Sequence, residues 1–570
     1  MRRRPLAASL AVLVAALLTG CVALPTSGPV GVGHPDPVEE SLELDTFVRS
    51  PQPGDSPEDI VQGFIDAAAS PRGNYAAAQQ YLTEEFQDEW RPDARATIDV
   101  RADRVFEAPK TLSDDATETQ VQVATTPVAA LTDVGQYEQP ESTAEAKLPY
   151  RLVTVDGEWR IAEAPQGLLV DELTFGEVYR SYELYFYSLD YRYLVPDLRW
   201  FARTDAVQTN VVRALLGGPG DWLAAGVATA FPEGTALEQS SVPIANGTAS
   251  VDLSGAQFDD TRTLQRMQAQ LDESLVGQVR NVDSVALSID GAAQDPPPLA
   301  DPPIQNPAVD PRPVVYDGET FGYLAASNDE VQPIEGVSEQ VAALAPTGAA
   351  VGAGGTSVAV RSEIGVSIVR SGDDPVTLDP RAGSSLIVPA IDPQGVVWSV
   401  PTAAPGELVA YPPEGDPIPM AVPWIGSTIS SLEVSRDGTR IIALLGDGTR
   451  ARFVAASIER DADGVPIGLG KVALALTSVS GAPRDVAWLD ANRVAALVEM
   501  PGGDTRVLVQ EIGGVPDDEA GPADGRMLDA GNGERSLRVL TAEGALEVPS
   551  GVTWQERASG FSFVSVQMPG

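Results

Sequence analysis

The sequence predicts a multidomain chain in which two α+β modules precede an all-β propeller of five or six blades. Helical and strand-like patterns alternate up to about residue 292. A segment dense in proline follows at 293–314, which favours a stiff extended linker between domains. From residue 315 onward, short apolar runs lie between turn residues, as in a propeller. The length of 570 residues also exceeds what one ordinary core supports.

The first 20 residues are typical of an export signal. Arg2, Arg3 and Arg4 precede an uncharged apolar run at 5–18, which is short for a bilayer-spanning helix. The following Leu-Thr-Gly-Cys, ending in Gly20 and Cys21, resembles the lipobox of bacterial lipoproteins. That resemblance implies cleavage between Gly20 and Cys21, with a diacylglycerol and an N-acyl chain on Cys21. The alternative is an ordinary secretory signal with an incidental cysteine.

Residue counts exclude the common catalytic centres. Cys21 is the only cysteine and His34 the only histidine, so the usual Ser-His-Asp, Cys-His and zinc sites are excluded. No phosphate-binding glycine motif is present, and we therefore expect no catalytic residue, no metal and no cofactor. A carboxylate pair remains open, since glycosidases need only two acids. Asp461 to Gly464 has part of a calcium-loop spacing without the later acid, which favours a plain turn.

Charge restricts the partners. The chain has 38 Lys and Arg against 81 Asp and Glu, for a formal net charge of -43. Nucleic acid is excluded, because phosphate binding requires basic side chains. The acidic body is also not expected to lie on an anionic lipid surface. With no second stretch of membrane-spanning length, we expect a body that lipid on Cys21 holds at the outer face of the cytoplasmic membrane.

The first module is predicted over 55–170, after a flexible Pro- and Gly-rich tether over 21–54. Ser56 followed by Pro57 predicts the start of a helix, and a second helix is expected over 75–90. Strand-like runs follow, and Asp156-Gly157 predicts a hairpin turn. Two helices followed by a curved antiparallel sheet resemble NTF2-like folds.

The second module is predicted over 176–292. Its aromatic segment at 179–193 alternates as a strand does, and core packing is favoured over stacking on sugars or a partner. Helices are expected over 206–216 and 261–276, and Asn246-Gly247 predicts a hairpin. The strand-like run "SVALSIDG" at 284–291 completes the order strand, helix, hairpin, helix, strand.

The propeller is predicted over 315–570. Four degenerate repeats each contain an apolar strand, a turn and a second apolar strand. We place their turns at Gly348, Gly395, Gly438 and Asn492. Separations of roughly 43 to 54 residues are typical of four-stranded propeller blades.

The region from Tyr182 to Gly291, with "NGTASVDLS" and "VDSVALSIDG", resembles the GerMN module of sporulation and germination proteins. Together with the lipobox, the N-terminal α+β region and the propeller, it makes the chain similar to the LpqB lipoproteins of actinobacteria. The "LPTSG" after Cys21 resembles the same family.

The resemblance to that family implies a role that composition does not. It implies a lipoprotein that contacts the extracytoplasmic sensor domain of a membrane histidine kinase, MtrB, in the MtrA–MtrB two-component system. Cell-wall homeostasis and division would depend on that contact, and only Cys21 corresponds to a functional residue of the family. Two alternatives stay open: a lipoprotein that binds or cleaves cell-wall glycans, and a structural lipoprotein of envelope assembly.

Overall fold

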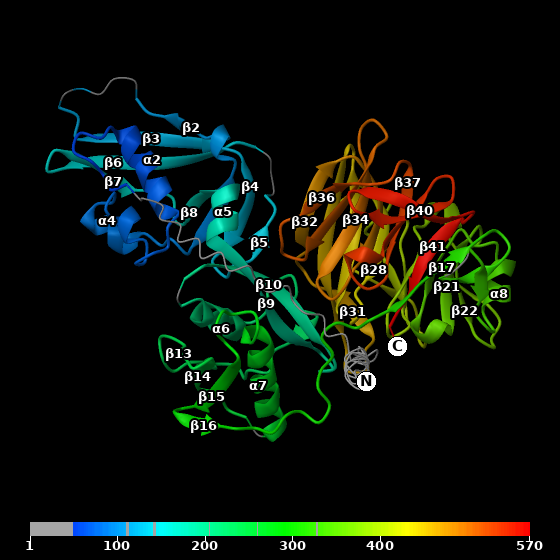
Figure 1. Cartoon of the computed structure of the whole chain (residues 1–570). Helices are drawn as coiled ribbons and strands as arrows, with labels where there is room; N and C mark the ends of the chain where they lie inside the picture. Colours follow the sequence, from blue (N-terminus) through cyan, green and yellow to red (C-terminus); the bar gives the residue numbers. More distant parts are fainter. Residues whose placement is uncertain are drawn as a thin grey trace, which may run out of the picture. The chain divides into compact units, whose positions relative to one another are not determined.

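The computed structural model describes residues 49–569 except 110–112, 114, 141–143, 205, 259 and 327–328. Gly20, Cys21 and His34 lie outside the described residues, so the predicted cleavage and lipidation stay predictions. The described chain contains two α+β modules, here called the N-terminal module and the middle module, followed by a β-propeller (Figure 1).

The N-terminal module packs short helices against two four-stranded sheets in the described part of the chain. The helices are α2 (Pro57–Ala68), α3 (Ala76–Gln79), α4 (Glu84–Glu89) and α5 (Glu172–Val178). One sheet has the order β5-β4-β1-β8, built from β5 (Tyr137–Glu138), β4 (Pro127–Thr132), β1 (Arg95–Asp99) and β8 (Leu168–Asp171). The other has the order β2-β3-β6-β7, built from β2 (Val105–Glu107), β3 (Glu118–Thr125), β6 (Ala146–Val155) and β7 (Glu158–Glu163).

The predicted start of the first helix is confirmed. The Ser56 hydroxyl accepts from the Asp59 amide, and the Asp59 carboxylate accepts from the Ser56 amide, which together form a capping box. The predicted turn at Asp156-Gly157 is also present, with φ of 52° and 83°, between β6 and β7.

The single helix predicted over 75–90 is wrong, because the chain leaves the helix between α3 and α4. Leu82 forms a parallel bridge to Ile161 of β7, and the Thr83 amide donates to the Ile161 carbonyl. The Thr83 hydroxyl then caps α4. The helical pattern of apolar residues was read correctly, but a partner strand 80 residues away interrupts it.

The middle module places two helices on a mixed sheet, as Figure 1 shows for α6 and α7 over β14 and β15. It begins with the hairpin of β9 (Tyr179–Ser188) and β10 (Leu194–Ala202), which is followed by α6 (Val207–Gly217) and β11 (Val227–Ala228). Its remaining elements are β12 (Ala236–Leu237), β13 (Ile244–Ala245), β14 (Thr248–Ser254), α7 (Thr261–Leu275), β15 (Ser284–Ile289) and β16 (Ala292–Gln294). The expected turn at Asn246-Gly247 joins β13 to β14.

The strands from residue 310 onward form six propeller blades within the described residues. The first blade contains β41 (Phe563–Gln567), β17 (Asp310–Tyr316), β18 (Phe321–Leu324) and β19 (Val331–Pro333). The second contains β20 (Gly348–Val351), β21 (Ser357–Ser362), β22 (Gly365–Arg370) and β23 (Val376–Asp379), and α8 (Ser338–Ala343) precedes it. The third contains β24 (Ala390–Ile391), β25 (Val397–Ser399), β26 (Val409–Tyr411) and β27 (Ile418–Pro419).

The last three blades follow the same plan with longer strands. The fourth contains β28 (Thr428–Val434), β29 (Arg440–Asp447), β30 (Arg450–Arg460), β31 (Pro466–Leu469) and β32 (Leu474–Ser480), the last two both paired with β30. The fifth contains β33 (Ala482–Trp488), β34 (Arg493–Glu499), β35 (Thr505–Glu511) and β36 (Asp517–Ala520). The sixth contains β37 (Gly525–Ala530), β38 (Leu537–Thr541), β39 (Ala545–Ser550) and β40 (Thr553–Ser559).

The propeller closes by pairing its last strand with its first. β41 lies antiparallel to β17, so the C-terminal strand completes the first blade. The first strands of neighbouring blades also contact one another in a ring, in the order β41, β20, β24, β28, β33 and β37. Such closure leaves no long sheet edge at which the ring could open.

Three of the four predicted turn positions join the first and second strands of a blade. Gly395 and Gly438 have φ of 80° and 74°, and Asn492 lies between β33 and β34. Gly348 is the exception, because it lies inside β20 and its φ is not positive. The equivalent turn of the second blade is at Gly354 and Gly355, with φ of 66° and 68°.

The proline-rich segment is shorter than the linker predicted over 293–314. β16 ends at Gln294 and β17 begins at Asp310, so residues 295–309 connect the two modules. Pro311 and Pro313 occupy the stretch of β17 where the pairing with β41 shifts register between Asp310 and Val314. A proline has no amide hydrogen to donate, and it is tolerated where the ladder is interrupted.

Candidate binding surfaces and the junction of the three modules

The segment with part of a calcium-loop spacing has a structural role. The Asp461 carboxylate accepts from the amides of Asp463 and Val465, which makes 461–464 a plain turn. Within the described residues, no group of three or more His, Cys, Asp or Glu could hold a metal ion. The described part of the chain also has no helix long and apolar enough to cross a membrane.

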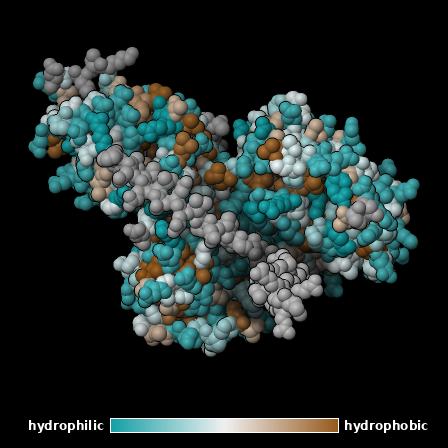
Figure 2. Space-filling view, in the orientation of Figure 1, coloured by the Kyte–Doolittle hydropathy of each residue, from teal (hydrophilic) through white to brown (hydrophobic). Residues whose placement is uncertain are grey.

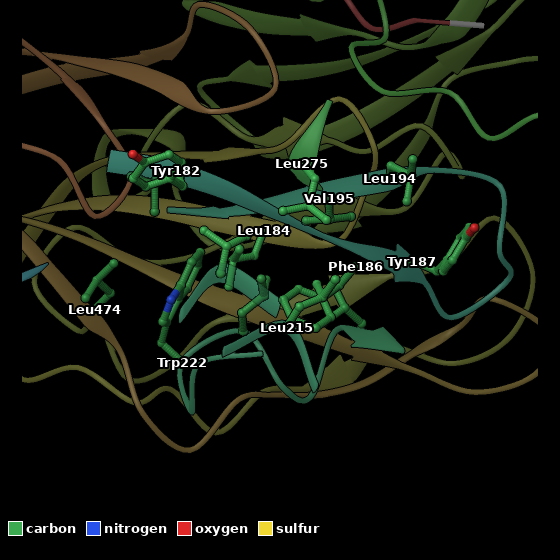
Figure 3. Packing of buried hydrophobic residues seen from close by; sticks show 14 of the residues in the cluster. Tyr182, Leu184, Phe186, Tyr187, Leu194, Val195, Leu215, Trp222, Leu275 and Leu474 are labelled. Atoms are coloured by element: carbon green, nitrogen blue, oxygen red, sulfur yellow. The ribbon is translucent and has the colours of Figure 1, made fainter. Parts of the chain in front are cut away.

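The aromatic segment of β9 forms core, as predicted. Tyr182, Leu184, Phe186 and Tyr187 are all buried. Figure 3 shows them packed with Val195, Leu215, Trp222 and Leu275 of the same module and with Leu474 of the propeller. Hydrophobic burial therefore continues across the boundary between the middle module and the propeller.

Several buried carboxylates in the propeller are paired with arginine. Asp437 bonds to Arg440 at 2.6 Å, with both side chains almost fully buried. Asp392 bonds to Arg460 and Asp379 to Arg381, each also at 2.6 Å. Charges held in this way fix turns and strand ends, and they leave these carboxylates without the free oxygen that glycoside chemistry requires.

Asp485, which is half-buried on β33, is one carboxylate whose pKa would suit an acid–base role. Burial and the charge of Asp529 raise its pKa, hydrogen bonds from Ser431 and from the Leu528 and Val486 amides lower it, and the resulting pKa is about 6. Both oxygens are already bonded, one to the Leu528 amide and one to the Val486 amide. The side chain thereby joins the inner strands of the fifth and sixth blades, and its role is structural.

Aromatic rings join the N-terminal module to the middle module. The ring of Trp200 on β10 lies 5.0 Å from that of Phe175 and 6.1 Å from that of Tyr137. The Trp200 amide donates to the Gly135 carbonyl at 2.7 Å. Burial raises the pKa of Tyr137 to about 12, so its hydroxyl stays neutral and packs as part of this cluster.

A buried ion pair supports the same contact. Arg199 and Asp197 on β10 are bonded at 2.7 Å and are each 1–2 % exposed. Arg199 also donates from Nη1 to the Val134 carbonyl of the N-terminal module. The Asp197 carboxylate accepts from the Gly220 amide, which ties the loop after α6 to the same strand.

One end of the propeller, here called the docked end, is where the first and second strands of the blades join, in the turns at 352–356, 392–396, 435–439, 489–492 and 531–536. The connections between third and fourth strands, such as 512–516 and 551–552, lie at the same end. The Trp200 indole donates to the Gly513 carbonyl there, at 2.9 Å. Asn492 donates from Nδ2 to Glu183 of β9 at 3.2 Å. A Cβ on Gly226 would lie 2.8 Å from the Thr439 carbonyl oxygen, so the middle module approaches this end too closely for a larger residue there.

The connecting segment 295–309 is bonded on both sides. Ile304 exchanges backbone hydrogen bonds with Arg192 and Leu194 at the tip of the β9–β10 hairpin. Asn306 accepts from the Ala491 amide through Oδ1, and Val309 exchanges two bonds with the Asn532 side chain. The segment therefore ties the middle module to the fifth and sixth blades.

The opposite end of the propeller, here called the far end, comprises the turns at 317–320, 363–364, 400–408, 447–449, 500–504 and 542–544. Ile364 is 58 % exposed there, and Ile425 in the connection to the fourth blade is 83 % exposed. The visible surface is otherwise mainly hydrophilic, with small separate apolar patches, as expected from the acidic composition (Figure 2). None of the contacts to the middle module described above falls on the far end.

Sequence patterns could not reveal the junction residues. Trp200, Asn492 and Gly513 belong to different segments, and no local period relates them. The only available signal was the concentration of aromatic residues in 179–201, which marks a strand covered on both faces. Only the structure identifies the surface that covers the second face of this strand.

Comparison with known proteins gives three matching family models. "Lipoprotein LpqB, N-terminal domain" matches residues 50–176, and "Lipoprotein LpqB beta-propeller domain" matches residues 322–562. "Sporulation and spore germination" matches residues 183–295. The three matches lie in the predicted order, and together they span most of the described chain.

Several curated relatives match over most of their length. "Lipoprotein LpqB" of Thermobifida fusca is 28 % identical, with 88 % of each chain covered. "Lipoprotein LpqB" of Streptomyces coelicolor is 26 % identical over 98 % of this chain and 97 % of its own. Solved structures include a nidogen/laminin complex, which is 10 % identical with a TM-score of 0.34 and covers 45 % of this chain and 97 % of the other. A streptogramin B lyase is 12 % identical with a TM-score of 0.30 and covers 42 % and 76 %.

Proposed function

Because the chain belongs to the LpqB family of lipoproteins, we propose that it is anchored through lipid on Cys21 and binds the sensor domain of a membrane histidine kinase. The site of action is the extracytoplasmic face of the cell membrane. Binding shifts the conformational equilibrium of the sensor and so modulates its two-component system, with effects on cell-wall homeostasis and division.

The packing of the three modules into one body is the observation that carries this proposal. A continuous hydrophobic cluster, the Trp200 contacts and the bonded segment 295–309 hold the propeller against the middle module. Modules that are already in contact need little further ordering on binding, which lowers the entropic cost of association. The buried carboxylates of Asp379, Asp437 and Asp392 form ion pairs with arginine side chains, which favours a binding role over hydrolysis of glycans.

Anchoring supplies the second part of the mechanism. A lipid anchor keeps the protein and a membrane kinase in one thin layer, which raises their effective concentration without any new contact. A moderate intrinsic affinity is then sufficient for occupancy. The strongly acidic surface keeps the body from adhering to anionic lipid in place of the partner.

We place the partner contact at the far end of the propeller, because the chain's own middle module occupies the docked end. Ile364 and Ile425 are large apolar side chains exposed at the far end. Val552, which is 97 % exposed in the β39–β40 turn, lies at the docked end and offers a matched control. The three residues are alike in chemistry and differ in the end of the propeller that they occupy.

Pull-down of the purified kinase sensor domain tests the proposal. The Ile364→Asp and Ile425→Asp variants should each weaken binding at least tenfold, about 1.4 kcal/mol. The Val552→Asp variant should bind as the parent does. Equal binding by all three variants would place the contact elsewhere, and unchanged kinase output in a deletion strain would favour a structural envelope role instead.

A further inference from the structure

Charged groups from both sides of the junction act on Glu511 of the propeller. Among the described residues, Glu183 of the middle module and Arg493, Asp490 and Glu534 of the propeller interact with it electrostatically. Arg493 bonds to Asp490 through Nε and to Glu534 through Nη1, both at 2.7 Å. Glu511 lies directly across the β34–β35 ladder from Arg493. A single guanidinium cannot balance this many negative charges, so docking brings like charges together.

Glu183 is held towards the propeller by two donors. The Tyr185 hydroxyl donates to Glu183 Oε2 at 2.5 Å, and Asn492 Nδ2 donates to Oε1 at 3.2 Å. Burial and then the charge of Glu183 raise the pKa of the Tyr185 hydroxyl, and Glu273 of α7 raises it further. The tyrosine therefore stays a donor, and Glu183 stays fixed as an acceptor facing Glu511.

Asn492 contributes an acceptor without a partner. Its side chain is 4 % exposed, and its Oδ1 has no hydrogen-bond donor. An unsatisfied buried acceptor costs free energy that a nearby O–H group can recover. Glu511 pairs across the β34–β35 ladder with Arg493, the residue after Asn492, and its carboxyl group gains an O–H donor once it takes up a proton.

We propose that the junction is a proton-linked joint, in which uptake of a proton at Glu511 strengthens docking of the middle module and the connecting segment on the propeller. Loss of the proton loosens the same contact. The joint is a property of this chain alone, and it holds whether or not a kinase is the partner.

The direction of the pH effect on docking follows from the thermodynamic linkage between proton binding and docking. Burial and then the charge of Glu183 raise the pKa of Glu511 to about 6 from an ordinary value of 4.5, while Arg493 lowers it and Asp490 and Glu534 raise it. Undocking removes the charge of Glu183 from Glu511, so the docked form binds more protons than the undocked form. Docking therefore has its full gain at low pH and loses this gain as the pH rises through about 6.

Amide hydrogen exchange on the full mature chain measures how strongly the connecting segment is docked on the propeller. The Ala491 amide reports docking, because its acceptor is Asn306 Oδ1 in the connecting segment. Its protection factor, corrected for the intrinsic pH dependence of exchange, should fall between pH 5.0 and 7.5. The fall reaches at most roughly 8-fold, the limit if undocking returned Glu511 to its ordinary pKa of 4.5. Val309, whose amide donates to Asn532, should change in parallel.

Glu511→Gln copies the protonated carboxyl. It should keep high protection at pH 7.5 and abolish the pH dependence. Glu547→Gln is the matched control, since burial raises the pKa of Glu547 too, but this residue lies on β39 away from the junction. That variant should behave as the parent.

Glu183→Gln provides an independent variant should Glu511→Gln fail to fold. Removing the facing charge should move the pH dependence to lower pH. Equal protection of the parent at pH 5.0 and 7.5 would overturn the proposal, as would an unchanged pH dependence in Glu511→Gln.

Discussion

The indole Nε1 of Trp200 donates a 2.9 Å hydrogen bond to the carbonyl oxygen of Gly513, which lies 313 positions later in the chain. The same ring packs against Phe175 and Tyr137 of the N-terminal module. Because Trp200 itself belongs to β10 of the middle module, one side chain contacts all three modules. Its removal should therefore affect the relation between modules more than the fold of any one of them.

Trp200→Phe should reduce the protection of junction amides while leaving the blades intact. The substitution keeps an aromatic ring and removes the donor, so we expect a loss of about 1 kcal/mol in docking free energy. Hydrogen exchange at Ala491 measures this loss. Trp554→Phe is the control, because its indole donates to the Ala520 carbonyl at 2.8 Å within the propeller. A similar loss at Ala491 in both variants would contradict a role at the junction.

Arg440→Met should destabilise the propeller by about 3–5 kcal/mol, because it leaves the Asp437 charge buried without its cation. Urea unfolding gives the free energy directly. Arg506→Met removes an exposed partner that lies 3.5 Å from Asp518, and this control should cost less than about 1 kcal/mol. If the two variants are equally stable, the buried pair adds nothing beyond what a surface pair does.

Asp379 should make the propeller lose stability in acid. Burial alone would raise its pKa, but hydrogen bonds from Arg381 and Ser399 outweigh burial, and the pKa lies below the ordinary 3.8. The group therefore stabilises the fold above that value, and the contribution disappears as the pH falls below it. The difference in unfolding free energy between parent and Asp379→Asn should be largest near pH 6 and shrink towards pH 3. A constant difference over this range would refute the assignment.

The elements that depend on neighbouring residues could be predicted from the sequence. The Ser56 cap, the Asn246-Gly247 turn and α7 were predicted because their causes lie within a few residues. The helix over 75–90 was predicted wrongly, since the pairing of Leu82 with Ile161 is a contact over 79 positions. Local pattern reports what a segment prefers, and a distant strand can override that preference.

The turn of the second blade shows a different limit. Gly348 was selected because glycine usually marks a turn, yet its backbone is extended and a Cβ there would lie 2.7 Å from the Val388 side chain. Glycine at position 348 allows close packing against Val388. At positions 354 and 355, glycine instead allows the left-handed backbone of a turn. The junction was beyond prediction for a related reason, because the pairing of Asn492 with Glu183 spans 309 positions and leaves no local signature.

Cys21→Ala should release the protein from the membrane, and this prediction tests the anchor on which the proposed function depends. Two or three acyl chains bind a bilayer far more firmly than one, whose association constant is only about 10⁴ M⁻¹. The variant should move from the membrane pellet to the soluble fraction and lose its effect on kinase output, while its urea unfolding matches that of the parent. His34→Ala changes a nearby residue of the predicted tether and should stay in the pellet. If Cys21→Ala remains in the pellet, a protein contact holds the chain there, and if it is soluble yet signals normally, the raised effective concentration is not needed.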